Sequence, residues 1–165
     1  MLLSLFTLAH VAISLVGILA GFFAMFGLLT SRSYDRWTAI FLVTTISTSV
    51  TGFLFPVQHF LPSHAVGILS IVVLSAASFA RYVRQLNGAW RKVYVIGVVL
   101  ALYLNVFVAI VQAFLKTPAL KAFAPTQTEF PFKATQLAVL VLFIALGVVA
   151  TVRFRPPSRQ KISFT

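Results

Sequence analysis

The sequence contains no cysteine and very few acidic side chains. Its 165 residues include only two Asp or Glu beside 13 Lys or Arg, and the formal net charge at pH 7 is +11. Without cysteine, disulfides, thiol nucleophiles and thiolate metal sites are excluded. Two carboxylates exclude most acid–base enzymes, and the sequence contains no G-x-S-x-G, no H-E-x-x-H and no glycine-rich phosphate loop. We therefore expect a protein that is not an enzyme.

Charged side chains are scarce and apolar ones abundant. Charged residues make up 9% and apolar residues 60% of the sequence, whereas an ordinary soluble domain has about 25% and roughly 45–50%. So few charges cannot cover the surface of a water-soluble protein. The composition therefore predicts an integral membrane protein, and the length predicts a single domain.

Five apolar segments are long enough to cross a bilayer as helices. A span needs roughly 20 mostly apolar residues for a hydrocarbon core of about 30 Å. The segments are 5–29, 37–57, 64–81, 93–115 and 133–152. The third reaches full length only if Arg81 and Arg84 extend to the lipid headgroups, and in a four-span alternative it is re-entrant. The sequence predicts an all-α bundle of five transmembrane helices over residues 1–152.

The basic residues predict the orientation of this bundle. Five spans place ten of the 13 basic residues on one side, and only Lys116, Lys121 and Lys133 on the other. By the positive-inside rule the basic side is cytoplasmic, so the N-terminus is outside and the C-terminus inside. Residues 117–132 then form an outer loop, with a short interfacial helix at 118–123, and residues 153–165 form a basic cytoplasmic tail.

The positive charge predicts contact with lipid headgroups. The basic residues are divided among three short segments beside the spans, with no soluble module to present them to nucleic acid, so no nucleic-acid partner is expected. The side chains expected at anionic headgroups are Arg32, Arg81, Arg84, Arg91, Lys92, Arg153 and Arg155.

Small residues mark the faces expected to pack against other helices. The first span contains Gly17-x-x-x-Gly21, and the fourth contains Gly97 and Ala101 four residues apart. Such patterns let two helix backbones approach closely in a membrane. Packing inside the bundle is favoured over homodimerisation for Gly17 and Gly21, because four other helices compete for that face.

Polar side chains converge on the outer half of the predicted bundle. Asn105 lies near the middle of the fourth span, where it needs a hydrogen-bond partner, and the hydroxyl-rich run TTISTSVTG of the second span offers one. A ligand contact is the alternative for Asn105. The residues expected to line a ligand site are His10, His64, Tyr103, Asn105 and Gln112.

Several functions are compatible with these residues. The leading hypotheses are an accessory subunit of a larger membrane complex or homo-oligomer, and a bundle that binds a lipid, quinone or other small molecule. His10 and His64 are metal ligands only under the alternative of an electron-transfer protein with b-type haem, because two imidazoles can bind both faces of one iron. No other cofactor is assigned. A small transporter is a further alternative, although the expected intramembrane carboxylate is absent.

Two stretches also carry a resemblance. These are RWTAIFLVTTISTSVTGFLFPVQHFLPSHAVGI, residues 36–68, and ALYLNVFVAIVQAFLKTPALKAFAPTQTEFPF, residues 101–132. They resemble small multi-pass bacterial inner-membrane proteins classed only as hypothetical. The resemblance implies a bacterial cytoplasmic membrane as the location, and it implies no activity, ligand or functional residue.

Overall fold

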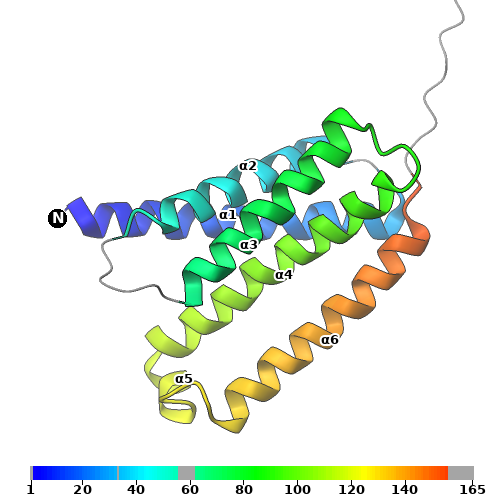
Figure 1. Cartoon of the computed structure of the whole chain (residues 1–165). Coiled ribbons are helices and arrows are strands. Elements are labelled where there is room, and N and C mark those ends of the chain that lie inside the picture. Colours follow the sequence, from blue (N-terminus) through cyan, green and yellow to red (C-terminus); the bar gives the residue numbers. More distant parts are fainter. Residues whose placement is uncertain (1, 33, 56–61, 156–165) are drawn as a thin grey trace, which may run out of the picture.

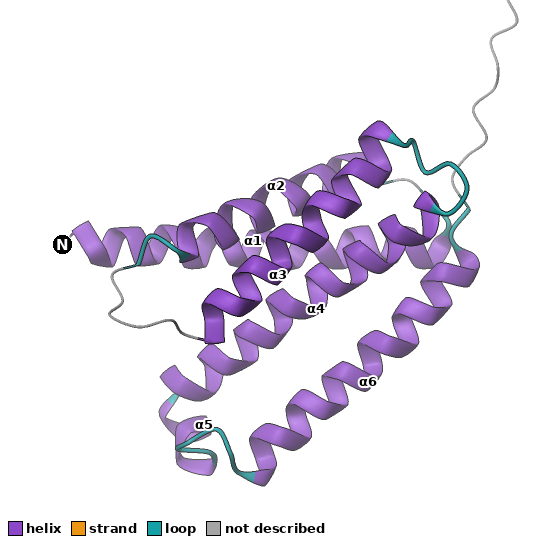
Figure 2. Cartoon of the chain, in the orientation of Figure 1, coloured by secondary structure: helices purple, strands orange, loops and turns teal. Residues whose placement is uncertain are grey.

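The chain folds into a bundle of helices. The structure, a computed structural model, describes residues 2–32, 34–55 and 62–155, and all regular elements in these ranges are helical (Figures 1 and 2). The elements are α1 (Leu2–Thr30), α2 (Asp35–Gly52), α3 (Pro62–Ser78), the π-helical turn η1 (Phe79–Val83), α4 (Trp90–Lys116), α5 (Pro118–Phe123) and α6 (Phe130–Arg153). The predicted all-α class is therefore confirmed.

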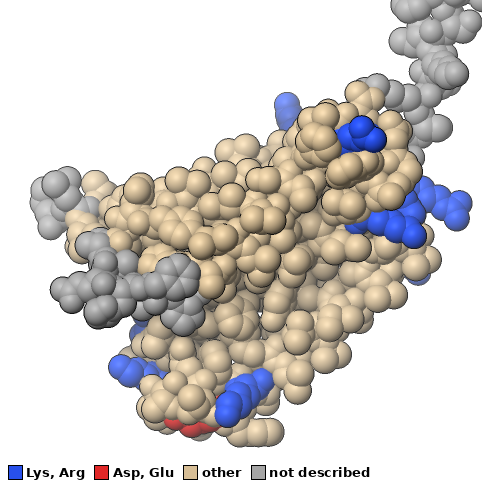
Figure 3. Space-filling view, viewed as in Figure 1, with Lys and Arg blue, Asp and Glu red and all other residues tan. Residues whose placement is uncertain are grey.

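The long helices run in alternating directions, so their charged ends collect at the two ends of the bundle (Figure 1). Figure 3 shows Lys and Arg at both ends, with an uncharged surface between them. We call the end at which α1 and α6 finish the basic end, and the opposite end, which carries α5, the α5 end. The described basic residues of the basic end are Arg32, Arg36, Arg81, Arg84, Arg91, Lys92, Arg153 and Arg155.

Within the described residues, four helices are long and apolar enough to cross a membrane, which indicates a membrane protein. They cover Leu3–Thr30, Ser63–Val83, Trp90–Lys116 and Phe130–Arg153. The segment 37–57, predicted as the second of the five spans, is not among these four helices. It forms a helix that ends at Gly52. The backbone turns there, because Phe53 N bonds to Val50 O at 3.1 Å, and Pro56 disfavours helix at the residue before it. Residues 56 and 57 of that prediction lie outside the described part of the chain.

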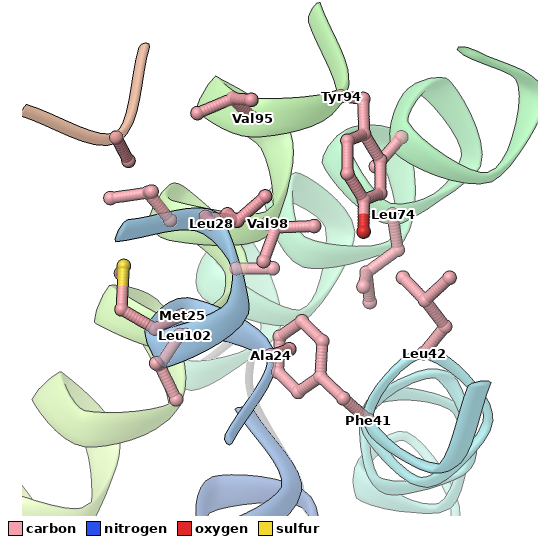
Figure 4. Close-up of a cluster of buried hydrophobic side chains, with 14 of the residues drawn as sticks. Ala24, Met25, Leu28, Phe41, Leu42, Leu74, Tyr94, Val95, Val98 and Leu102 are labelled. Carbon is pink, nitrogen blue, oxygen red and sulfur yellow. The ribbon is translucent and has the colours of Figure 1, made fainter. Parts of the chain in front are cut away.

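The apolar core is largest in the half of the bundle nearer the basic end. Figure 4 shows Ala24 and Leu28 of α1, Phe41 of α2, Leu74 of α3 and Val98 of α4 pointing toward one another. Gly21 lies beside this cluster, and a Cβ atom there would be 2.5 Å from the Leu102 Cδ1 atom and 2.9 Å from the Phe41 ring. The Gly17–Gly21 face thus packs inside the bundle, because only a residue without a side chain fits so close to its neighbours.

Gly97 and Ala101 on α4 also lie in close packing. A Cβ atom at Gly97 would be 2.9 Å from the Ala77 Cβ atom of α3, and Ala101 is fully buried. The small side chains of α3 and α4 therefore let these two backbones approach each other, as small residues do in membrane bundles.

The loop between α5 and α6 is held by one carboxylate. Helix α5 covers the 118–123 segment expected from the sequence. Glu129 Oε1 accepts hydrogen bonds from Thr126 Oγ1 (2.8 Å) and Thr126 N (3.2 Å), and Oε2 accepts one from Thr128 N (3.0 Å). Desolvation acts in the opposite direction, but these hydrogen bonds lower the pKa of the Glu129 carboxyl. The charged form is thus the one that the loop stabilises.

Candidate functional site

A polar cavity lies between α1, α2, α3 and α4, in the half of the bundle nearer the α5 end. Its volume is about 110 Å³. Ten of its lining residues carry a polar side chain or are glycine: His10, Ser14, Thr48, Ser49, Gly52, Ser63, His64, Gly67, Ser70 and Asn105. The other lining residues are Phe53, Val66, Leu104 and Val108. No charged side chain lines this cavity among the residues that the structure describes, so its chemistry is that of neutral hydrogen-bonding groups.

His10 reaches the cavity from α1 and is held by α2. Its Nδ1 atom lies 2.8 Å from Thr51 Oγ1, and Thr51 Oγ1 in turn donates to the Ser47 carbonyl at 2.7 Å. With the hydroxyl proton directed to Ser47, Nδ1 is the donor to Thr51, and Nε2 of the neutral ring is left as an acceptor. The Phe55 ring meets the imidazole edge to face at 5.1 Å. Both contacts fix the ring orientation.

His64 lies in the first turn of α3 and also lines the cavity. Its ring stacks on the ring of Phe53, with 5.6 Å between centroids and an interplanar angle of 16°. Phe53 fits there because Gly67 has no side chain: a Cβ atom on Gly67 would be 3.1 Å from the Phe53 ring. His10 and His64, which are 54 positions apart in the sequence, thus line the same cavity.

Asn105 lies in the cavity wall contributed by α4. Its Nδ2 atom donates a hydrogen bond of 3.0 Å to Thr45 Oγ1 of α2, which is the helix expected to supply its partner. Close by, Thr48 Oγ1 is buried and makes no hydrogen bond to any atom of the residues that the structure describes. Leaving a buried hydroxyl unsatisfied costs about 1–3 kcal/mol. Thr48 is therefore a residue of the cavity wall whose hydroxyl is not satisfied by the described protein atoms.

Two other predicted site residues lie elsewhere. Gln112 is exposed and does not line the cavity. Gln112 lies seven residues beyond Asn105 on nearly the same face of α4. Helix α2 runs parallel to α4 and ends at Gly52, seven residues beyond Thr45, the partner of Asn105. At the level of Gln112, α2 therefore comes to its end. Tyr103 lies two residues from Asn105, which turns it by about 200°. Its ring packs on Phe143 of α6 at 5.7 Å.

The described residues offer little to a metal. No group of three or more His or acidic side chains that could hold a metal ion occurs within residues 2–32, 34–55 and 62–155. The cavity that His10 and His64 share is also well below the roughly 300–1,000 Å³ of sites for drug-sized ligands. The haem macrocycle is at least as large as such ligands, so this space does not fit it.

A polar cluster at the basic end was not recognised from the sequence. Arg81 was expected to extend to the headgroups, but it turns inward and is only 13% exposed. Its guanidinium donates to Tyr94 Oη at 2.9 Å and to Asp35 Oδ1. Arg81 lies within η1, where Arg84 N bonds to Phe79 O five residues earlier. A π-helical turn of this kind rotates the side chains that follow it relative to an α-helix.

The Arg81 cluster joins three helices by side-chain contacts. Asp35 begins α2, Arg81 lies in η1, which continues α3, and Tyr94 lies in the second turn of α4. Tyr94 is 2% exposed. The signal available in the sequence was Asp35 itself, since one of only two carboxylates in a basic chain is expected to attract an arginine. Because Arg81 already has these partners, we regard the cluster as a structural link.

Comparisons of the chain with models of protein families, with curated proteins and with solved structures find no match.

Proposed function

We propose that this protein is a non-enzymatic membrane protein that binds a small neutral molecule in its polar cavity. The observation that carries the proposal is a cavity lined by imidazole, hydroxyl and amide groups, in whose wall the buried Thr48 hydroxyl has no partner among the described residues. A neutral hydroxyl compound matches this lining, because one hydroxyl can both donate to and accept from neutral imidazole, hydroxyl and amide groups. A charged ligand would find no counter-charge among the lining groups described.

The size of the cavity limits the ligand to about one ring. An engineered apolar cavity of about 150 Å³ in another protein holds benzene, and the cavity here has about 110 Å³. The ring of a quinol, which is neutral and carries hydroxyls, is in this size range. Haem ligation by His10 and His64 is less well supported than a small polar ligand.

We further propose that α2 also spans the membrane, which gives five spans in all. The N-terminus is then outside and the C-terminus in the cytoplasm. The proposed location is the inner membrane of a bacterial cell. The 18 residues of α2 extend about 27 Å, close to the hydrocarbon thickness of about 30 Å. Helix α2 packs against both α1 and α3, and all the arginines described lie at the basic end. The positive-inside rule then places that end in the cytoplasm.

Fusion reporters test this threading. Alkaline phosphatase, which is active only outside the cytoplasm, should be active at the N-terminus and inactive at the C-terminus, and a reporter that fluoresces only in the cytoplasm should show the reverse. Phosphatase activity from both ends, or from neither, would mean an even number of spans and would exclude α2 as a span.

Phenol and benzene test the ligand class, because they share one ring and differ by one hydroxyl. The purified protein in detergent should bind phenol at least tenfold more tightly than benzene, as measured by ligand-observed NMR, a difference of about 1.4 kcal/mol. Ser14→Leu places a larger apolar side chain in the cavity wall and should abolish phenol binding. Ser4→Leu is the matched control, because Ser4 lies exposed on the same helix. Equal affinity for the two probes, or unchanged phenol binding by Ser14→Leu, would contradict the proposal.

A further inference from the structure

A second hollow lies between α4 and α6 and shares no lining residue with the polar cavity. Its volume is about 460 Å³, within the roughly 300–1,000 Å³ of small-molecule sites. Its walls are almost entirely apolar and include Ile96, Val99 and Leu100 of α4 and Leu140, Ile144 and Gly147 of α6. The Thr151 hydroxyl in its wall already donates to Gly147 O at 2.7 Å. We call this hollow the α4–α6 groove.

The groove lies between two hydrogen-bonded attachments of α6, and within it the two helices also touch where the Tyr103 and Phe143 rings meet at 5.7 Å. At the basic end the Arg91 guanidinium donates to the Thr151 carbonyl at 3.3 Å and to the Phe154 carbonyl. At the α5 end Gln136 Nε2 donates to the Phe107 carbonyl at 3.2 Å. Between these attachments Gly147 has no side chain with which to fill the space. The result is an apolar groove along the membrane-facing side of the bundle.

Positive charge stands at one end of the groove. Lys92 lies four residues before Ile96, on the same face of α4. Arg153 is the last residue of α6, one position beyond the lining residue Val152 and about 100° around the helix from it. Both side chains are exposed. Asp35, the one acidic residue described at the basic end, is bonded to Arg81. The charge at this mouth of the groove is therefore complementary to an anion.

The length of the groove matches one leaflet. Leu140 and Val152 line its two ends on α6, and the twelve steps between them extend about 18 Å along the helix. Half of a hydrocarbon core of about 30 Å is about 15 Å. An acyl chain that starts at headgroup level at the basic end would therefore follow the groove through its own leaflet.

We propose that the α4–α6 groove binds one anionic phospholipid from the leaflet at the basic end, with an acyl chain against Val99 and Ile144 and the phosphate between Lys92 and Arg153. The site requires that α4 and α6 lie in a membrane, and it does not depend on the polar cavity. The basic side chains distinguish an anionic headgroup from a zwitterionic one, and the groove holds the chain.

Native mass spectrometry of the full chain tests this site with dimyristoyl phosphatidylglycerol and dimyristoyl phosphatidylcholine as probes. The unaltered protein should retain one phosphatidylglycerol with at least tenfold preference over phosphatidylcholine. Lys92→Gln with Arg153→Gln should reduce this preference about tenfold. Lys121→Gln with Lys133→Gln removes equal charge at the α5 end and should leave the preference unchanged.

A groove-filling variant tests where the acyl chain lies. A Cβ atom on Gly147 would be 3.3 Å from Val99 Cγ1, so Gly147→Leu should fill the groove and reduce retention of both lipids. Equal retention of the two lipids by the unaltered protein, or an undiminished preference in the Lys92 and Arg153 variant, would overturn the proposal. The charge variant alters only exposed side chains, so it decides the question even if Gly147→Leu does not fold.

Discussion

Gly21→Leu is expected to lower the free energy of unfolding by about 3 kcal/mol, the upper part of the usual range for overpacking. The new Cβ atom would lie 2.5 Å from Leu102 Cδ1 and 2.9 Å from the Phe41 ring. Both of these side chains are fully buried, so they cannot move away without displacing their own neighbours. Helix α1 would then have to separate from α2 and α4.

Titration of the protein from mild detergent into sodium dodecyl sulfate, followed by the fluorescence of Trp37 and Trp90, measures this change. Ala12→Leu is the matched control, because Ala12 is exposed on the same helix, and we expect it to change stability by less than about 0.5 kcal/mol. If both variants unfolded at the same detergent fraction, the face of α1 that contains Gly21 would not be the one that packs in the bundle.

Arg81→Met is expected to destabilise the fold by about 2 kcal/mol, within the range of roughly 1.5–3 kcal/mol for a hydrogen bond to a charged group. The buried Tyr94 hydroxyl loses the donor that lies 2.9 Å away, and the Tyr94 ring loses the guanidinium that lies 5.2 Å from its centroid. The ion pair with Asp35 adds little, because that carboxylate is 73% exposed and water replaces the arginine there.

Arg84→Met gives the comparison, since it removes the same charge three residues further along. Arg84 is exposed and contacts the Trp90 ring at 5.3 Å, an interaction worth about 0.5–1 kcal/mol at an exposed site. The same detergent titration should therefore show Arg81→Met as clearly the less stable variant. If Arg84→Met lowered the stability as much as Arg81→Met, the positive charge at the basic end would account for the effect, and the inward hydrogen bonds of Arg81 would not.

Local sequence patterns predicted the elements whose positions depend on nearby residues. The segment 118–123 begins with Pro118, directly after Thr117, and proline at a first helical position is a local signal for the start of a helix. The apolar stretches that form α1, α4 and α6 are long enough to be recognised by length alone. The end of α2 was placed five residues too late, because its last apolar residues were counted as span although the chain turns at Phe53.

The candidate site was only partly predictable for a related reason. Residues on one face of a helix share a direction, and His10, His64 and Asn105 do line one cavity. Helix periodicity does not say where a neighbouring helix ends, however, so Gln112 was grouped with Asn105 although it lies exposed. Tyr103 was assigned to the same site, and it packs on Phe143 of α6 instead.

Composition and spacing by themselves determined that this chain is an all-helical membrane protein with one strongly basic end, since scarcity of charge and length of apolar runs are properties of the sequence alone. Only the tertiary structure decided which groups meet. It turned Arg81 inward toward Tyr94, left the Thr48 hydroxyl without a partner among the described residues in the wall of a polar cavity, and left a groove between α4 and α6 beside Gly147. These outcomes depend on where neighbouring helices begin, end and diverge, and that is set by packing between segments far apart in the chain.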